Sequence, residues 1–402
     1  MPSVLQINVA SNKGSTGKIA ENIGLTALQD GWRSYIVHGE RYSGKTILED
    51  ISFNSTFSEY VHYIISILFD AHGKGSYLTT KKIVKRIREI KPDIVHLHNI
   101  HGYYINYKLL FNVLNELNIP IVWTMHDCWP FTGHCVYFDK VGCEKWKEIC
   151  ECCPQLDSYP RAFIDFSKRN YTDKKKYFTQ LKNLTLVPVS NWLSSLVSQS
   201  FLAKFPRVVI HNGIDLNVFK PRESDLRSQL KLNGKKVILG VADGYGTRKG
   251  LNDFIQLSNY LNDEYQIILI GVTESDCAKL PKKIQYLYRT SNQTELAEYY
   301  SMANVYVNPT YEDNFPTTNI EALACGTPVI TYNTGGSPEA INDQTGIVVE
   351  KGNISLLCDS IIRLCNEDRD LIRKQCLLRA EGEFDMNKRF KEYLNLYVNL
   401  LK

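Results

Sequence analysis

The sequence predicts an α/β fold made of two doubly wound, Rossmann-like domains that face a cleft. Its 402 residues exceed what one ordinary hydrophobic core can bury, so length alone favours two domains. Short β-branched runs alternate with helical stretches, which is typical of parallel sheets built from right-handed βαβ units. The alternation falls into two series, separated near residue 207 by a turn-rich connection. We therefore expect an N-terminal domain at residues 1–207, a second domain at 208–385, and a C-terminal helix at 386–402 that crosses back to the first domain.

Each strand of the predicted sheets is a short run rich in Val, Ile and Leu, as expected for strands buried on both faces. The first series places strands at residues 4–7, 34–37, 93–97, 119–123 and 186–189. The second places them at residues 207–210, 236–239, 266–270, 284–286, 305–307, 328–330 and 346–349. The segment after the last strand ends in an amphipathic helix near residues 386–401.

The composition is that of an ordinary globular protein. Hydrophobic residues make up 44% and charged residues 22%, which argues against disorder. The formal net charge of +4 creates no strong field, so we expect no nucleic-acid partner. The N-terminal residues lack the pattern of a signal peptide, and the apolar stretch at 60–69 is too short to span a bilayer. We expect a cytoplasmic protein with mostly reduced cysteines.

A basic amphipathic helix is predicted at residues 81–91, and two interpretations of it stay open. Its cations could rest on the anionic inner face of the cytoplasmic membrane, which would make the protein peripheral there. Alternatively, it packs on the sheet with a solvated basic face, which Pro92 and the following strand favour. The cations are Lys81, Lys82, Lys85, Arg86, Arg88 and Lys91.

In open α/β sheets, ligands bind at the carboxyl ends of strands, so the loops there are the candidates for a site. The first strand leads through Gly14 and Gly17 into a helix, where backbone N–H groups can meet an anion. A P-loop is excluded because only two residues separate these glycines and Ile19 follows Lys18. A structural turn and a contact to phosphate or acceptor both remain open.

His126 follows another predicted strand, and its side chain would face the cleft if the register holds. The alternative is a buried core histidine with satisfied hydrogen bonds. A separate group, His96, His98 and His101, lacks the ligand spacing of a recognised zinc motif, and we expect no metal there.

The glycine-rich segment at 240–250 joins a strand to a helix and carries Arg248 and Lys249. This pair suits a diphosphate, because cations are unfavourable at the positive end of a helix unless an anion is present. Further on, a strand, an acidic loop, a helix and another strand follow in order, with Asp313 in the loop and Glu321 on the helix. These two carboxylates could bracket a polyol by accepting hydrogen bonds from its hydroxyl groups.

At these residues the chain resembles glycosyltransferase family 4 (GT4), a large family of the GT-B fold that builds bacterial surface polysaccharides, including lipopolysaccharide and capsule. The motifs that carry the resemblance lie at residues 189–192, 210–221, 248–250, 313–321, 322–329 and 335–339, so they span nearly the whole second domain. Each motif is weak by itself, but their order and spacing are specific.

The resemblance implies a transferase that moves a hexose-type sugar from a UDP- or GDP-sugar to a growing glycan or lipid-linked acceptor, with retention of anomeric configuration and no metal needed for catalysis. The family's Glu-x7-Glu signature implies that Glu321 binds the donor ribose and that its first member, here Asp313, contacts the transferred sugar. Glu312 lies one residue out of register and is a second candidate. The catalytic residues are expected to be His126, Arg248, Lys249 and Asp313, and the donor-binding residues Gly14, Gly17, Glu312, Asn314, Phe315, Thr317, Thr318 and Glu321.

The sequence departs from the family pattern at two places. Pro316 replaces the usual glycine and removes a backbone N–H, and no Arg follows the strand that ends at Leu239. Arg248 and Lys249 would then carry more of the charge that stabilises the leaving diphosphate. Two other functions remain open: a sugar-nucleotide epimerase of similar fold, and a non-catalytic sugar-binding subunit.

Six of the eleven cysteines fall in a predicted insertion at residues 128–153. Cys135, Cys143, Cys150 and Cys153 could supply four thiolates to a structural zinc, since a closing Cys-x2-Cys is half of many such sites. Packed reduced thiols are the main alternative, and disulfides are disfavoured in a cytosolic chain.

Overall fold

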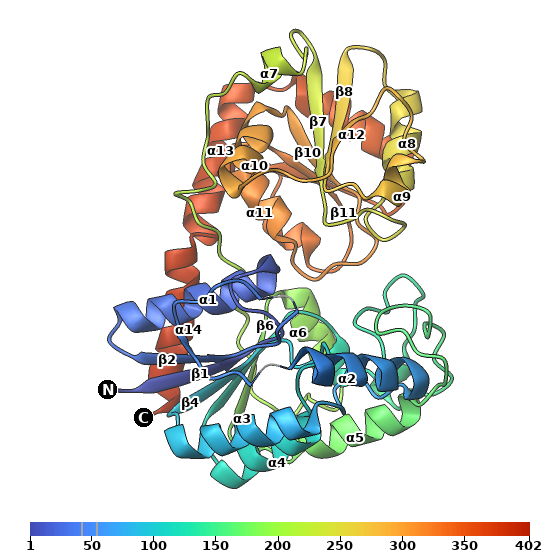
Figure 1. Ribbon diagram of the computed structural model, residues 1–402. Coiled ribbons are helices and arrows are strands. Elements are labelled where there is room, and N and C mark those ends of the chain that lie inside the picture. Colours follow the sequence, from blue (N-terminus) through green and yellow to red (C-terminus); the bar gives the residue numbers. More distant parts are fainter. Residues whose placement is uncertain (42, 54) are drawn as a thin grey trace. The chain divides into compact units, whose positions relative to one another are not determined.

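The computed structural model describes residues 1–41, 43–53 and 55–402. The chain forms two compact units. The first unit contains residues 1–211 and 389–402, and the second contains residues 212–388. Each unit is a six-stranded sheet flanked by helices (Figure 1).

In the first unit the strands are β1 (Ser3–Ile7), β2 (Arg33–Val37), β3 (Glu49–Asp50), β4 (Ile94–Leu97), β5 (Ile121–Met125) and β6 (Leu184–Pro188). They pair in parallel in the order β3-β2-β1-β4-β5-β6. The helices are α1 (Gly14–Gln29), α2 (Thr56–Phe69), α3 (Tyr77–Ile90), α4 (Tyr107–Leu117), α5 (Ser167–Thr179) and α6 (Asn191–Val197), with short 3-10 turns η1 (Trp129–Phe131) and η2 (Lys145–Lys147).

In the second unit the strands are β7 (Lys236–Val241), β8 (Tyr265–Ile270), β9 (Gln285–Leu287), β10 (Val305–Asn308), β11 (Val329–Tyr332) and β12 (Gly346–Val349). They are also parallel, in the order β12-β11-β10-β7-β8-β9. The helices are α7 (Leu226–Gln229), α8 (Leu251–Tyr260), α9 (Glu274–Cys277), α10 (Gln293–Met302), α11 (Thr317–Ala324), α12 (Ile354–Asn366) and α13 (Arg369–Glu383), with one 3-10 turn, η3 (Ser337–Ala340). The prediction of two doubly wound parallel sheets is confirmed.

Two details of the strand prediction are wrong. The run at 207–210 does not begin the second sheet. Arg207 instead forms an isolated parallel bridge with Leu186, and the Val208 N–H donates to the Leu186 carbonyl at 3.1 Å, at the edge of the first sheet. The short edge strand β3 was not predicted, because its two residues, Glu49 and Asp50, are exposed and acidic and carry no apolar signal.

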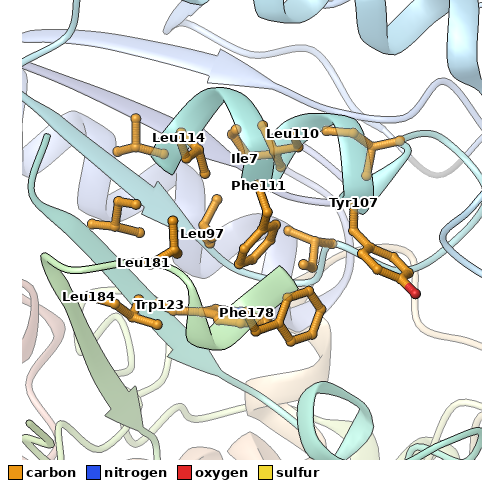
Figure 2. Close-up of a cluster of buried hydrophobic side chains, with 14 of the residues drawn as sticks. Ile7, Leu97, Tyr107, Leu110, Phe111, Leu114, Trp123, Phe178, Leu181 and Leu184 are labelled. Atoms are coloured by element: carbon orange, nitrogen blue, oxygen red, sulfur yellow. The ribbon is translucent and has the colours of Figure 1, made fainter. Parts of the chain in front are cut away.

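The core of the first unit lies between the sheet and helices α3, α4 and α5. Figure 2 shows Leu97 of β4 and Trp123 of β5 in one buried cluster with Phe111 of α4 and Phe178 of α5. The Phe111 and Phe178 rings lie 4.4 Å apart between centroids. Successive strand residues point to opposite faces, so this packing fixes which side chains of β4 face the other side of the sheet.

The last helix, α14 (Met386–Leu400), covers that other face of the first sheet. His96 of β4 points to the face opposite Leu97, and its Nδ1 lies 2.6 Å from the Tyr397 hydroxyl. The Tyr393 ring stacks on the His96 ring at 5.3 Å. Across the described ranges, no helix is both long enough and apolar enough to cross a membrane.

Candidate functional site

The candidate donor site lies where the strand order of the second sheet reverses. β7 is the first strand of this sheet in the sequence, and in the sheet it lies between β10 and β8. The loops after β7 and β10 therefore diverge from adjacent strands, which is where open α/β sheets bind ligands. Arg248 and Lys249 lie in the first loop, and Glu312 and Asp313 in the second.

Backbone contacts hold these two loops together. The Tyr311 N–H donates to the Arg248 carbonyl at 2.8 Å. Gly250 caps α8 with φ +72°, and a Cβ atom there would lie 2.4 Å from the Pro309 carbonyl oxygen. Only glycine adopts this conformation without strain and leaves room for the second loop.

The side chains join the same two loops. Arg248 donates from Nη1 to the Glu312 carbonyl at 3.0 Å. Lys249 forms a short ion pair with Asp313, and both side chains are largely buried, with 17% and 15% of their surface exposed. Lys249, predicted to bind the diphosphate, and Asp313, predicted to bind the sugar, thus neutralise each other's charge. An anion that enters here competes with a carboxylate for the Lys249 ammonium.

The two carboxylates that the sequence left open differ in their surroundings. Asp313 faces Lys249 and accepts the Asn314 N–H at 2.9 Å through its other oxygen. The Glu312 residue is buried, with 7% exposed. Asp313 therefore lies directly beside a cation of the first loop.

Helix α11 begins at this edge of the sheet. Its N-cap residue is Pro316, which provides no side-chain hydrogen bond, and Thr317 and Thr318 form its first turn. The first N–H groups of a helix have no partner within the helix and carry partial positive charge, so they suit an anion. The predicted phosphate-binding amides thus sit at a helix start without a side-chain cap.

Glu321 lies one turn further along α11 and is held by a residue that the sequence analysis missed. The buried Tyr300 of α10 donates its hydroxyl to Glu321 Oε2 at 3.0 Å. Burial, together with the Glu321 charge, raises the pKa of Tyr300 well above its ordinary value, so the phenol keeps its proton and remains a donor. Tyr300 therefore fixes one carboxylate oxygen of Glu321.

Asn314 and Phe315 connect the acidic loop to the loop after β11. The Gly336 N–H donates to the Asn314 carbonyl at 2.7 Å, and a Cβ on Gly335 (φ +55°) would lie 1.8 Å from the Asp313 carbonyl oxygen. Both Asn314 and Phe315 are buried, with 2% and 4% exposed. They act in the structure as supports of the loop.

The remaining predicted residues belong to the first unit. Gly14 begins α1 with φ +65°, and among the residues that the structure describes no atom lies within 4 Å of the position of an added Cβ. Gly17 packs against Ala10, with 3.3 Å between the added Cβ and the Ala10 Cβ. The Gly14 position requires glycine for its backbone angle, and the Gly17 position requires it for close packing.

His126 directly follows β5, and a chain of hydrogen bonds fixes its tautomer. Gln6 donates its amide to the Ala20 carbonyl at 2.8 Å, so its Oε1 accepts from His98 Nε2 at 3.0 Å. His98 Nδ1 must then accept from His126 Nε2, at 3.2 Å. Burial lowers the pKa of His126 to about 4, so the ring is neutral and carries its lone pair on Nδ1.

His101 and Asp127 form a second pair close to His126 in the chain. His101 Nε2 lies 2.8 Å from Asp127 Oδ2, and both side chains are buried. Although burial opposes ionisation, the neighbouring His101 holds the pKa of Asp127 below its ordinary value. The sequence analysis considered His101 only as a metal ligand and rejected it. The pairing with Asp127 could not be seen there, because the two residues follow different strands.

The four predicted zinc ligands, Cys135, Cys143, Cys150 and Cys153, line one cavity together with Phe138 and Trp146. In the described ranges, however, no three His, Cys, Asp or Glu side chains are arranged to hold a metal ion. Within the described ranges none of the eleven cysteines is part of a disulfide, which contradicts the disulfide alternative.

Burial raises the pKa of the thiols of both Cys150 and Cys153 to about 11, and the pKa of Cys135 rises further. These thiols are neutral at physiological pH when no metal is bound, and zinc would have to displace their protons. Elemental analysis decides between bound zinc and packed thiols, since one equivalent of zinc in the purified protein would mean that the sulfurs close on a metal.

The chain matches two known protein-family descriptions. Residues 30–218 match the family described as Glycosyltransferase Family 4, and residues 222–377 match Glycosyl transferases group 1. The chain belongs to glycosyltransferase family 4. The resemblance inferred from the motifs is confirmed, and the protein is a glycosyltransferase.

Two relatives and two solved structures illustrate the match. The glycosyltransferase is 24% identical to the putative colanic acid biosynthesis glycosyl transferase WcaC of Escherichia coli K12, over 99% of this chain and 100% of the relative. It is 26% identical to the capsular polysaccharide biosynthesis glycosyltransferase CapM of Staphylococcus aureus, over 54% of this chain and 62% of the relative.

Among solved structures, the sucrose-phosphate synthase of Thermosynechococcus elongatus matches with TM-score 0.72 and 19% identity, over 100% of this chain and 99% of that one. The Anabaena protein Alr3699/HepE, in complex with UDP, matches with TM-score 0.69 and 14% identity, over 99% of this chain and 100% of that one. At these identities the structures establish the fold of the glycosyltransferase.

Proposed function

We propose that this glycosyltransferase moves a hexose-type sugar from a nucleotide-sugar donor to a growing polysaccharide or lipid-linked acceptor. The observation that carries the proposal is the junction of the loops after β7 and β10, which gathers Arg248, Lys249 and Asp313 beside the start of α11. The names of the relatives support the acceptor class: WcaC and CapM are named for colanic acid and capsular polysaccharide biosynthesis. A third, from Campylobacter jejuni, is named for transfer to a diphospho-undecaprenol acceptor.

The donor nucleotide is proposed to lie along α11. Glu321, whose carboxylate accepts the Tyr300 hydroxyl, would accept hydrogen bonds from the ribose hydroxyls. The N–H groups of Thr317 and Thr318 would donate to the diphosphate. UDP is the first nucleotide to test and GDP the second, because the solved structures of HepE contain UDP, UDP with glucose, and UDP-glucose.

The transferred sugar is proposed to contact Asp313, with Glu312, Asn314 and Phe315 supporting the loop. As the anomeric bond breaks, negative charge grows on the diphosphate, and Arg248 and Lys249 would stabilise it. The Lys249 ammonium would then turn from Asp313 toward the leaving group. Asp313, freed from part of that pairing, would accept hydrogen bonds from sugar hydroxyls. We propose retention of configuration, with the leaving phosphate taking the acceptor's proton.

The first unit is proposed to supply the acceptor side, through His126 and the turn at Gly14 and Gly17. Burial lowers the pKa of His126 to about 4, so an acceptor hydroxyl would meet a neutral ring there.

The test combines binding and turnover. A nucleotide-sugar donor should raise the melting temperature of the protein, because it binds only the folded state. Lys249→Ala should lower kcat roughly a hundredfold, as expected when one donor to a developing anion is lost. Glu321→Gln should mainly raise KM for the donor. The matched controls are Lys279→Ala and Glu264→Gln, which change exposed residues of the same unit.

The outcomes separate the remaining alternatives. Normal turnover in both Lys249→Ala and Glu321→Gln would sink the site assignment. Conversion of the nucleotide sugar without any acceptor would indicate an epimerase. Donor binding without transfer to lipid-linked or glycan acceptors would indicate a sugar-binding subunit. The family match favours neither of these two alternatives.

A further inference from the structure

Helix α2 lies in the first unit (Figure 1). It is amphipathic in the opposite sense to an ordinary surface helix. Its buried residues are polar: Glu59, His62 and Ser66. Five of its exposed residues are apolar and lie at positions i, i+3, i+4, i+7 and i+11, which form one outward stripe. We call this stripe the α2 face; it consists of Phe57, Tyr60, Val61, Ile64 and Leu68.

The buried polar side holds the helix in this orientation. His62 Nδ1 lies 2.6 Å from the Tyr103 carbonyl, while Nε2 accepts the N–H groups of Gly73 and Gly75 at 3.1 and 3.0 Å. Glu59 accepts the Glu40 N–H at 2.7 Å. Turning the helix to bury its apolar side would break these bonds and leave their partners unsatisfied. The apolar side is therefore fixed outward.

The α2 face is large and carries no charge. Phe57 is 78% exposed and Tyr60 55%, and the one charged residue of α2, Glu59, is buried. The patch continues onto neighbouring segments. The Phe163 N–H donates to the Ile67 carbonyl at 2.8 Å, which places the 62%-exposed Phe163 against α2. An exposed apolar patch that joins several large side chains in this way marks an interaction surface.

Basic side chains border the patch at both ends of α2. At its start, the Thr79 hydroxyl lies 3.3 Å from that of Ser58, which brings the first turn of α3 and its Lys81 alongside. At its end, Arg169 donates to the Phe69 carbonyl at 3.1 Å. The border residues stack cations on aromatic rings, Lys81 on Tyr77, Arg161 on Phe163 and Arg169 on Phe166.

We propose that the α2 face and its basic border dock the first unit on an anionic lipid bilayer. The apolar stripe would enter the boundary between headgroups and acyl chains, and the cations would meet anionic headgroups. Helix α2 has 14 residues, about 21 Å at 1.5 Å per residue, so it lies in the membrane plane and does not span it. A second copy of the chain is disfavoured as the occupant, since a two-fold contact would bring the same basic borders together.

This docking differs from the sequence-based prediction of a basic helix at 81–91, in which α3 itself rests on the membrane. The inward residues of α3, Ile83, Val84 and Ile87, are buried in the core of the unit. The structure therefore places α3 as a packed helix. Lys81, just after its first turn, supplies charge, and α2 supplies the apolar anchor.

The test is flotation of the full-length protein with vesicles, in the absence of any donor or acceptor. The protein should float with vesicles of phosphatidylethanolamine and phosphatidylglycerol and much less with phosphatidylcholine vesicles. The variant Phe57→Ser/Ile64→Ser/Leu68→Ser should weaken binding by about tenfold or more, since three large apolar side chains no longer enter the bilayer. The matched control is Leu371→Ser/Leu378→Ser, which removes two leucines of α13 that are 59% and 52% exposed.

A second variant tests the charged border independently. Lys81→Gln/Arg161→Gln/Arg169→Gln should reduce binding to the anionic vesicles and leave the melting temperature nearly unchanged, because these side chains lie at the surface. It also keeps the test decisive if the serine variant fails to fold.

Equal flotation of wild type and both variants would overturn the proposal. So would sedimentation showing a dimer that the serine substitutions dissociate, because the face would then bind a second copy. Flotation needs no catalysis, so its failure leaves the proposed transferase function intact.

Discussion

At the scale of single residues, the pairing of Lys249 with Asp313 is the central feature of the candidate site. Opposite charges this close and this little exposed hold each other strongly, and breaking such a pair by removing one partner costs more than removing both. The two residues should therefore behave as a unit in kinetic measurements.

We predict that the double variant Lys249→Ala/Asp313→Ala loses less activity than the product of the two single losses. Lys249→Ala leaves a partly buried carboxylate that repels the donor diphosphate, and the second substitution relieves that repulsion. A double-mutant cycle on kcat/KM measures the coupling, which we expect to be about 1–3 kcal/mol. Additive losses would mean that the two residues act separately.

We predict that Tyr300→Phe raises KM for the donor about fivefold to tenfold and changes kcat little. The substitution removes one hydrogen bond to Glu321, worth about 1–1.5 kcal/mol, and keeps the ring. Steady-state kinetics with varied donor checks this. Tyr299→Phe, in the same helix, is the matched control and should keep wild-type KM.

The sequence indicated Arg248 and Lys249 in one strand-loop-helix unit and Asp313 and Glu321 in another, because the residue pattern within each unit carries the signal. Tyr300 could not be found this way. Its role depends on the packing of α10 against α11, and a tyrosine in a helix has no pattern that names its partner. The Gln6 and His98 contacts that set the tautomer of His126 were hidden for the same reason, since they join three different strands.

At the scale of elements, the loops after β7 and β10 depend on one backbone position. Gly250 is both left-handed and in contact with the opposite loop, whereas Gly234 (φ +76°) is left-handed with no atom within 4 Å of an added Cβ. Comparing the two separates backbone strain from steric conflict.

We predict that Gly250→Ala destabilises the protein by about 1 kcal/mol or more beyond Gly234→Ala. Both substitutions pay about 1–2 kcal/mol for the left-handed conformation, and only the first pushes against Pro309. Thermal unfolding followed by circular dichroism gives the difference. Equal destabilisation would show that the second loop yields without cost, and transfer activity should then survive in both variants.

Most strands were predictable because β-branched runs buried on both faces are continuous in sequence. The segment at 207–210 was misassigned for a physical reason: it has the same apolar character, but it makes only a bridge at the edge of the first sheet. The inverted helix α2 could not be identified, because periodicity shows two faces of a helix and not which of them is buried.

At the scale of the whole molecule, the first unit contains an unusual number of buried neutral histidines. Burial lowers the pKa of His62 and of His126 to about 4, and it holds the pKa values of His72, His96 and His98 well below the ordinary value. In the unfolded chain each of them titrates near pH 6.5. The unfolded chain therefore binds more protons than the folded unit below that pH.

We predict that the first unit loses stability as the pH falls from about 6.5 toward 4 and that these histidines add no pH dependence above about 7. Each contributes at most about 1.4 kcal/mol per pH unit within that window. His38 opposes the trend: although burial lowers its pKa, the hydrogen bond to Asp50 raises it above its ordinary value.

Urea unfolding at pH 7.5 and 5.5, followed by tryptophan fluorescence, measures this effect. The method reports on the first unit alone, because all five tryptophans lie within residues 1–211. A free energy of unfolding that is unchanged between the two pH values would contradict the prediction.

The return of α14 to the first unit has a consequence for synthesis on the ribosome. Residues 389–402 belong to the first unit but are translated only after the whole of the second. Until then, the face of β4 that carries His96 lacks Tyr393 and Tyr397. The first unit therefore stays incomplete while the second unit is synthesised. A nascent chain stalled before residue 386 should be the form that chaperones bind and proteases cut.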